Sequence, residues 1–194
     1  MHMHRLTDTT SRSPRQAQID CSRESIVGAY SKLIARMPDD RITVSAICST
    51  AGVGRQTFYR HFKNKKDVFA YRIDLGYDIF CEQLRQLPRS SLTLDVILEK
   101  AFEFWRQYQT VLNPLARSSD LSHWFMEKFS QIWHGIAREF LPVSDSNQYD
   151  IEFQIAGIAG VFLHWLNRDM KESPEEITRC IMTLLDHHNL NHRH

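Results

Sequence analysis

Glycine and proline are scarce in this sequence, with 7 and 6 copies among 194 residues. Soluble proteins hold about 7% glycine and about 5% proline on average, so the turn-forming residues are well below their usual share. A fold of many short strands joined by tight turns needs more of them. The scarcity therefore favours long helices. The 42% of hydrophobic residues is enough to bury a core, which excludes a chain disordered throughout.

Closely spaced cysteines and long apolar runs are also absent. The four cysteines lie at least 27 residues apart, so neither a zinc ribbon nor a disulfide framework is indicated. The most apolar segment, residues 153–166, is interrupted by Gln154 and His164 and is too short to span a bilayer. Residues 1–18 lack the apolar centre of a signal peptide. We therefore expect a cytoplasmic protein with reduced thiols and no membrane partner.

Signatures of catalysis are missing as well. The sequence contains no GxGxxG, P-loop or HExxH pattern, and Ser118, Ser119, Asp120 and His123 lack the glycines of a nucleophile elbow. We expect no enzyme and no cofactor, and keep a helical enzyme only as the remote alternative.

A metal site is not expected either. His188 and His192 stand at the i, i+4 spacing that suits a shared metal ion, within a tail that also holds His187 and His194. Their place in a terminal tail favours adventitious binding.

Apolar residues recur at helical spacing along most of the chain, and no window alternates as a half-buried strand does. The sequence predicts an all-α fold of about nine helices. We expect helices at 22–37 behind Ser22 as cap, 44–51, 54–61, 64–87, 94–112, 124–141, 149–170 and 174–188, with 113–122 as a break or short helix and 142–148 as polar loop.

The net charge of +1 hides an uneven distribution. Residues 1–72 hold 13 Lys and Arg against 6 Asp and Glu, a net +7, which leaves −6 for the remainder. The cations are densest in residues 41–66, where six of them stand without one carboxylate. Such a stretch is well suited to bind phosphates, so we expect the first part of the chain to meet a polyanion.

Two short helices joined by a tight glycine turn are predicted within this basic stretch, which reads TVSAICSTAGVGRQTFYRHFKNKK from Thr43. Gly52 at the end of the first helix suits a left-handed backbone, and Val44, Ile47 and Val53 are expected to be buried. This is the plan of a helix-turn-helix, whose second helix enters the major groove of DNA.

The stretch resembles the N-terminal domain of the TetR family of bacterial transcriptional regulators. The resemblance covers about residues 22–70 and rests on the initial Thr43, the Ala-Gly-Val turn, the Thr-Phe-Tyr-x-x-Phe core of the recognition helix and the following Asn-Lys. The rest of the chain resembles the family only in being helical, aromatic-rich and of suitable length. Two positions depart from the family: Gly54 stands where a serine often caps the recognition helix, and Gln56 where the residue is frequently small.

The resemblance and the side-chain chemistry together predict two base-reading residues. Arg55 and Gln56 stand at the start of the recognition helix, and Arg pairs bidentately with guanine as Gln does with adenine. Tyr59, one turn further on, matches a family position that contacts a base or a phosphate. Phe58 and Phe62 are expected in the core, where they fix the recognition helix.

Other side chains are expected at phosphates. Thr57 and His61 match phosphate-binding positions of the family. Lys65 adds its ammonium to the positive end of the next helix, and Thr43 offers a hydroxyl. Arg60 is expected either to contact the DNA backbone or to lie in solvent. Replacing Lys65 by alanine is expected to weaken all DNA sites alike and to lower the salt slope by about 1.

The mix of His, Thr, Ser and Arg at the start of the chain predicts a disordered arm at 1–19. In TetR-like proteins the C-terminal region dimerises and binds a ligand, so we expect a DNA-binding domain at 20–66 and an effector and dimerisation domain at 67–190. Glycines within the helix 149–170 cost about 1 kcal/mol each, which close approach of a second helix compensates. A two-fold dimer also matches a palindromic operator. Close packing within one subunit is the alternative. The expected interface is Gly157, Gly160, Val161, His164, Ile177, Ile181 and Leu185.

Large aromatic residues are abundant in the same region and predict a pocket for a small apolar or aromatic effector. The alternative is that they form an ordinary core and that a protein coregulator controls the DNA-binding domain, which a closed core favours. We expect a homodimeric regulator, in the family's commoner mode a repressor, that an effector releases from double-stranded DNA. The residues expected to line the pocket are Phe102, Trp105, Tyr108, Trp124, Phe129, Trp133 and Phe162.

Overall fold

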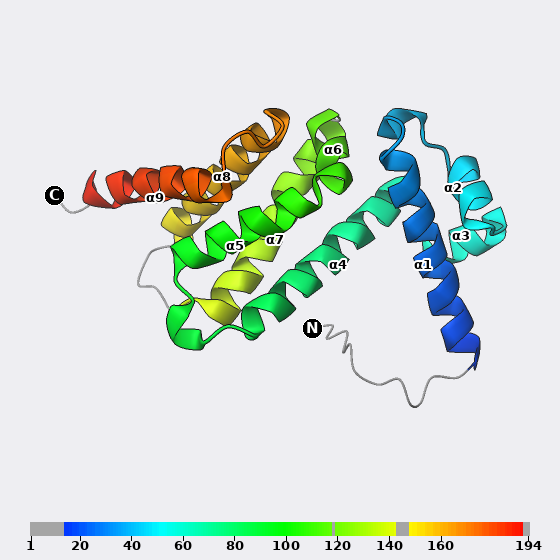
Figure 1. The fold of residues 1–194 in the computed structure, drawn as a ribbon, viewed down its shortest axis with the longest axis horizontal. Coiled ribbons are helices and arrows are strands. Elements are labelled where there is room, and N and C mark those ends of the chain that lie inside the picture. The colour runs from blue at the N-terminus through cyan, green and yellow to red at the C-terminus, as the bar shows by residue number, and fades with distance from the viewer. Residues whose placement is uncertain (1–13, 118, 143–147, 192–194) are drawn as a thin grey trace. The chain divides into compact units, whose positions relative to one another are not determined.

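A computed structural model describes residues 14–117, 119–142 and 148–191. These residues form nine α-helices and two short 3-10 turns, Asp39–Arg41 and Arg89–Ser91, and contain no strand (Figure 1). The all-α prediction is confirmed. The helices are α1 (Pro14–Ile34), α2 (Val44–Ala51), α3 (Arg55–His61), α4 (Lys65–Arg85), α5 (Leu94–Gln107), α6 (Gln109–Arg117), α7 (Ser119–Phe140), α8 (Gln148–Asn167) and α9 (Pro174–Asn191).

The chain divides into two compact units, residues 1–72 and 73–194, and the division falls inside α4. In the first unit α1, α2 and α3 pack together. Their shared core is apolar and fully enclosed, with Ile26, Tyr30, Ile47, Phe58 and Phe69 among its largest buried side chains. A small unit of this kind fixes a short helix such as α3 by tertiary packing, because seven residues are too few to hold a helix in isolation.

The first helix begins earlier than the sequence suggested. Ser22 lies inside α1, where its hydroxyl donates to the Ile19 carbonyl at 2.9 Å, so the prediction that Ser22 caps the helix is wrong. A mid-helix serine can satisfy its hydroxyl on a preceding carbonyl without ending the helix. Pro14 stands at the first helical position, which proline favours. Residues 14–19 are therefore helical, while the rest of the expected arm lies outside the described residues.

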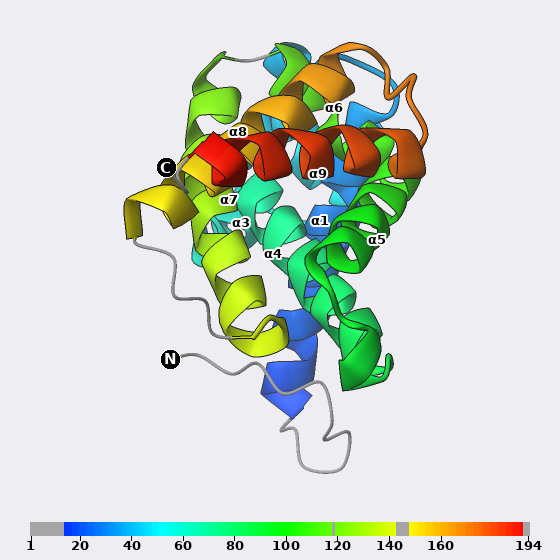
Figure 2. The ribbon, with the colours of Figure 1, turned by 90° about the vertical axis from the view of Figure 1, so that its left-hand side faces the viewer.

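In the second unit α9 runs along α5, and α6 and α7 pack with α8 (Figure 2). The expected single helix over 94–112 is wrong, because α5 ends at Gln107 and α6 follows directly after Tyr108. Residues 113–117, expected as a break or short helix, complete α6, and Leu112 and Leu115 are buried there. The apolar spacing continues through the junction, so periodicity alone does not reveal the change of helix axis.

The last helix has the start that its sequence predicts. Ser173 Oγ accepts from the backbone amide of Glu176 at 3.1 Å, and the Glu176 carboxylate accepts from the amide of Ser173 at 2.8 Å. This reciprocal pair, a capping box, satisfies two amides at the beginning of α9, with Pro174 at the first helical position.

Candidate functional site

The helix-turn-helix forms as the sequence predicts. Thr43 caps α2, its Oγ1 accepting from the amide of Ala46 at 3.1 Å, and α2 has the predicted bounds Val44–Ala51. Gly52 ends it with φ of 68°, a left-handed conformation that a side chain disfavours. Val53 N–H then donates to the Cys48 carbonyl at 3.0 Å and closes the turn. The turn sets the direction in which α3 leaves.

Two phenylalanines hold the recognition helix α3 in place. Phe58 and Phe62 are both buried, as expected, with ring centroids 6.0 Å apart. Phe62 also meets Tyr71 of α4 edge-on at 5.8 Å. Because these anchors occupy one side of the short helix, its other side is left for solvent or a partner.

The free side of α3 carries the predicted base readers. Arg55, Gln56 and Tyr59 are all exposed, and Thr57 is half-buried. Tyr59 is 57% exposed, although its ring meets that of Phe58 edge-on. Gly54 caps the start of α3 without a side-chain hydrogen bond, as its lack of a hydroxyl implies. The arrangement presents a guanidinium, an amide and a phenol on one short helix.

His61 is less available to a phosphate than the sequence implied. Its Nε2 lies 2.7 Å from the hydroxyl of Ser22 in α1, and the side chain is half-buried. Burial, and then the charges of Arg23 and Arg60, lower the pKa of His61 below its usual value of 6.5. The lowered pKa favours the neutral imidazole at pH 7. Because the Ser22 hydroxyl hydrogen is donated to Ile19, the single N–H of the neutral ring is donated to Ser22, and a phosphate contact by the other ring nitrogen requires the protonated form.

Lys65 stands at the first position of α4 but is not a free cation. Its Nζ lies 2.9 Å from Oδ2 of Asp39 and donates as well to the backbone carbonyl of Asp39. Sequence reasoning missed Asp39 because the two residues are 26 positions apart and only the fold brings them together. Asn64, as predicted, caps α4 by accepting from the amide of Asp67 at 3.1 Å.

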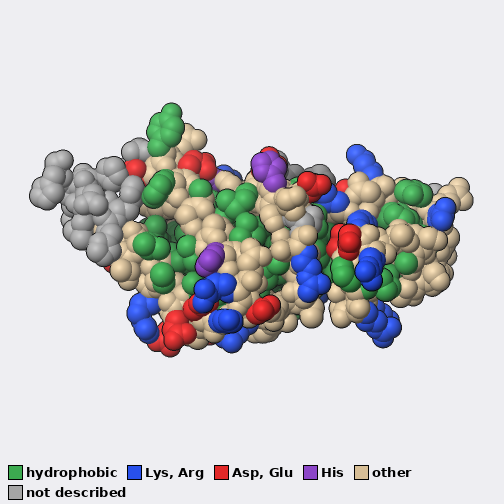
Figure 3. Space-filling model, turned by 90° about the horizontal axis from the view of Figure 1, so that it is seen from above, with side chains coloured by type: hydrophobic (Ala, Val, Ile, Leu, Met, Phe, Trp, Pro, Cys, Tyr) green, Lys and Arg blue, Asp and Glu red, His purple; other side chains and the backbone are tan. Residues whose placement is uncertain are grey.

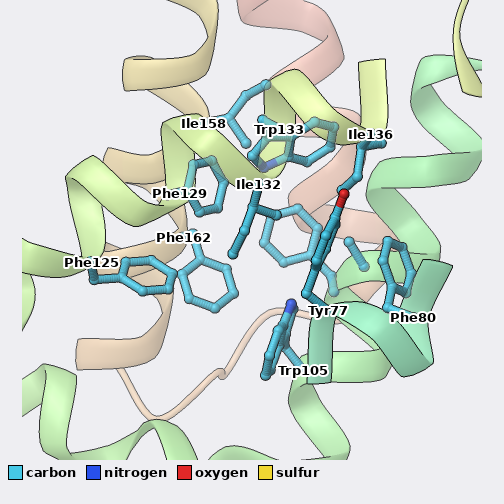
Figure 4. A pocket seen from close by; sticks show the side chains of 12 residues that line it. Tyr77, Phe80, Trp105, Phe125, Phe129, Ile132, Trp133, Ile136, Ile158 and Phe162 are labelled. Carbon is cyan, nitrogen blue, oxygen red and sulfur yellow. The ribbon is translucent and has the colours of Figure 1, made fainter. Parts of the chain in front are cut away.

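An aromatic cluster fills the core of the second unit and encloses a cavity of about 30 Å³ (Figure 4). Five of the seven residues predicted to line a pocket do line this cavity, whereas Tyr108 and Trp124 do not. Ligand pockets for drug-sized molecules usually have about 300–1,000 Å³, and 30 Å³ is close to the volume of one water molecule. The cluster is therefore a nearly closed core. The five are Phe102, Trp105, Phe129, Trp133 and Phe162.

Two glycines let the cluster close in this way. A Cβ added to Gly76 of α4 would lie 2.7 Å from the Trp105 ring, and one added to Gly135 of α7 would lie 2.4 Å from the hydroxyl oxygen of Tyr77. Neither approach is possible for a residue with a side chain unless the aromatic group shifts. Both glycines therefore serve side-chain packing within the second unit.

One face of α8 carries large apolar side chains that are exposed among the residues that the structure describes. Tyr149 is 86% exposed and Phe153 61% exposed. On the face of the molecule seen in Figure 3, hydrophobic side chains reach the surface at several places. Gly157 and Gly160 are also exposed, with nothing within 4 Å of an added Cβ. Of the other interface residues predicted on α8, His164 is exposed and Val161 is half-buried. Packing inside one chain therefore does not account for the two glycines.

The residues predicted for the interface on α9 lie on the side of the helix that faces the core of the subunit. Ile177, Ile181 and Leu185 are buried within the chain, because α9 packs along α5. The expected interface is therefore corrected on α9, because the apolar stripe of this helix packs into the core of its own subunit. The exposed side of α9 carries Cys180 and Leu184 instead.

Two further expectations concern metals and membranes. In the parts of the chain that the structure describes, no group of three His, Cys, Asp or Glu side chains is placed to hold a metal ion. The side chain of His188 and the whole of His192 lie outside those parts. Among the described helices, none combines the length and the hydropathy needed to cross a membrane.

Together, α2, the glycine turn and the exposed α3 define a helix-turn-helix protein. The family model for bacterial regulatory proteins of the tetR family matches residues 28–71, and that for a transcriptional regulator C-terminal region matches residues 93–187. The two matches together cover more than half of the chain. The chain belongs to the TetR family of bacterial regulatory proteins.

Comparisons with individual proteins agree. An HTH-type transcriptional regulator of Staphylococcus aureus strain MRSA252 is 25% identical over 114 residues, which are 57% of this chain and 62% of the relative. Another from strain USA300 is 26% identical over 88 residues, 45% of this chain and 48% of the relative. The chain thus spans about half to three fifths of the length of the curated relatives it matches.

Solved structures show the same fold. A TetR regulator from Streptococcus agalactiae has a TM-score of 0.61 and 20% identity, with 88% of this chain and 97% of that chain covered. Lin0861 from Listeria innocua has a TM-score of 0.69 at 14% identity, covering 91% and 94%. The dihydroxyacetone kinase operon activator DhaS has a TM-score of 0.58 at 18% identity, covering 84% and 93%.

Proposed function

We propose that the protein acts as a homodimer whose two α3 helices read a palindromic DNA operator. The observation that carries this proposal is the uncovered face of α8, where Tyr149 and Phe153 are exposed beside Gly157 and Gly160. A second copy of α8 on this face would bury the two aromatic rings, and the glycines would let the helices approach closely. A two-fold dimer presents one α3 to each half of a palindrome.

Within each half-site, Arg55 and Gln56 are proposed to contact base edges, because both are exposed at the start of α3 and have bidentate groups. The side chains around these two residues are proposed to contact phosphates. The proposed phosphate contacts are Thr43, Thr57, His61 and Lys65, and Tyr59 reaches a base or a phosphate.

A titration tests this function. Fluorescence anisotropy with a labelled pool of duplex DNA is measured between 50 and 200 mM salt, and the molar mass of the free protein is measured by light scattering. We expect binding that weakens steeply with salt and a mass of two chains. A monomer that does not bind duplex DNA would contradict the proposal.

The output of the regulator is the second part of the proposal. We propose that it represses and is released by a small apolar effector that enters the aromatic core. A cavity of about 30 Å³ cannot hold such a molecule unless its lining side chains move. Trp105, packed against Gly76, is the side chain whose displacement would enlarge it most directly.

The closed core favours a second candidate, in which a protein coregulator controls the DNA-binding domain. Indole and naphthalene are suitable probes, because they are small, apolar and aromatic. A rise in melting temperature with probe concentration supports the effector, since ligands that bind only the folded state stabilise it. No rise at millimolar probe supports the coregulator. Similarity to an operon activator, DhaS, leaves activation as the alternative output.

A further inference from the structure

Asp39 holds Lys65 through two contacts. One is the ion pair between Lys65 Nζ and Asp39 Oδ2 at 2.9 Å, and the other is the hydrogen bond from Nζ to the Asp39 backbone carbonyl. An ammonium has three N–H donors, so a single donor of Lys65 is left for any other acceptor. The Lys65 side chain is only 30% exposed and that of Asp39 only 14%.

Asp39 is itself fixed. Its Oδ1 accepts from the hydroxyl of Tyr30 at 2.8 Å, and Tyr30 is buried in the core of the first unit. Burial and the adjacent Asp39 carboxylate raise the pKa of Tyr30, so the phenol remains a donor at all ordinary pH values. The backbone carbonyl of Asp39 also accepts from Ile42 N–H at 2.9 Å in the short 3-10 turn. The carboxylate cannot turn away from Lys65 without losing the hydrogen bond from Tyr30, and the bond from Ile42 fixes the backbone that carries it.

This arrangement changes what a phosphate would meet at the start of α4. Residues 41–66 hold six cations and no anion, but the fold adds the carboxylate of Asp39 to one of those cations. A phosphate near Lys65 would face an ion pair in place of a free cation, and the negative charge of Asp39 would repel it. Counterion release depends on the net charge that a protein brings to the backbone, so a paired lysine contributes less than a free one.

We propose that Asp39 is an internal competitor of the DNA phosphate for Lys65, and that it sets the affinity and salt dependence of binding without affecting which sequence is read. The proposal rests on the placement of Lys65 beside a phosphate proposed above. It replaces the expectation that removing Lys65 from the natural chain lowers the salt slope by about 1. Tyr30 acts through Asp39 as a positioning residue, since it touches no DNA and keeps the carboxylate beside the ammonium.

The test compares Asp39→Asn with Asp40→Asn in the full chain. Asparagine keeps the size of the side chain and an oxygen that can accept from Tyr30. Asp40 is the exposed neighbour in the same turn, so its replacement removes the same charge without changing the contacts between Asp39 and Lys65. Binding of a duplex pool is measured at several salt concentrations between 50 and 200 mM, after circular dichroism has shown that both variants are folded.

We expect Asp39→Asn to bind more tightly than Asp40→Asn, with a salt slope steeper by about 0.9, the value for one additional phosphate contact. Its advantage should then shrink about 3.5-fold between 50 and 200 mM salt. Equal slopes would overturn the proposal. Weaker binding by Asp39→Asn would overturn it too, because Asp39 would then position Lys65 for DNA.

Lys65→Gln in both backgrounds separates this proposal from the proposed function. Removing Lys65 should change the slope little in the natural chain and by about 0.9 in Asp39→Asn. A drop of about 0.9 in both backgrounds would show that Lys65 binds phosphate despite Asp39, which contradicts the competitor but not the regulator. If no variant bound DNA in a salt-dependent way, the proposed DNA-binding function itself would fail.

Discussion

Ser22 of α1 and His61 of α3 share a hydrogen bond of 2.7 Å between Oγ and Nε2, which ties the recognition helix to the first helix. Burial, and then Arg23 and Arg60, lower the pKa of His61. Protonation therefore opposes the folded arrangement. The free energy of unfolding of the DNA-binding unit therefore depends on pH through His61.

The sign of this linkage predicts acid sensitivity. A histidine whose pKa is lowered in the folded state binds more protons when unfolded, so its contribution is complete above the unfolded pKa of about 6.5 and is lost as the pH falls toward the folded value. Between pH 7.5 and pH 5.5, the melting temperature of the natural chain should fall further than that of His61→Gln. His123→Gln is the control, because the His123 side chain is 84% exposed, and it should follow the natural chain. Identical shifts in all three would show that His61 carries no linkage.

Close packing at Gly135 predicts an unusual response to alanine. Alanine is normally the better helix residue by about 1 kcal/mol, but a Cβ here would lie 2.4 Å from the Tyr77 hydroxyl oxygen. We expect Gly135→Ala to lower the free energy of unfolding by about 1–3 kcal/mol, as overpacking does. A Cβ added to Gly28 would have nothing within 4 Å, so Gly28→Ala should raise the free energy of unfolding by about 0.5–1 kcal/mol. Urea denaturation compares them, and equal effects would contradict the packing argument.

The uncovered face of α8 predicts a separation between folding and association. Gly160→Leu adds a side chain where the chain itself leaves open space, so the folded subunit should persist. The added bulk should prevent a second α8 from approaching. We expect light scattering to report one chain for Gly160→Leu and two for Gly28→Leu, a glycine in equally open space on α1. A dimeric Gly160→Leu would place the interface elsewhere.

Local motifs of the sequence predicted local structure well. Thr43, Gly52, Asn64 and the Ser173–Glu176 pair occupy the caps and the turn that their chemistry favours, because such contacts span three or four residues. Ser22 is the exception among the local motifs, because it lies inside α1 and does not cap it. Three longer-range relationships were also missed: the end of α5, the inward side of Ile181, and the pairing of Asp39 with Lys65. Each depends on which helices pack together. An apolar stripe shows that one side of a helix is buried, but it does not show which element buries it.

Arg55 predicts a loss of specificity distinct from a loss of affinity. Its guanidinium is exposed at the first position of α3, where bidentate pairing with guanine is available. Arg55→Ala should cost about 1–3 kcal/mol at one base pair in each half-site and relax the preference there. Lys63→Ala, an exposed cation outside α3, should weaken all sequences alike. A uniform loss in Arg55→Ala as well would show that this residue contacts only the backbone.

The most direct test of the central claim is selection of bound sites from a random duplex library by the natural chain. The account predicts an enriched palindrome whose half-sites are centred about 10 base pairs, or a multiple of that, apart, as paired recognition helices require. Enrichment of single-stranded DNA, or of no sequence at all, would contradict it.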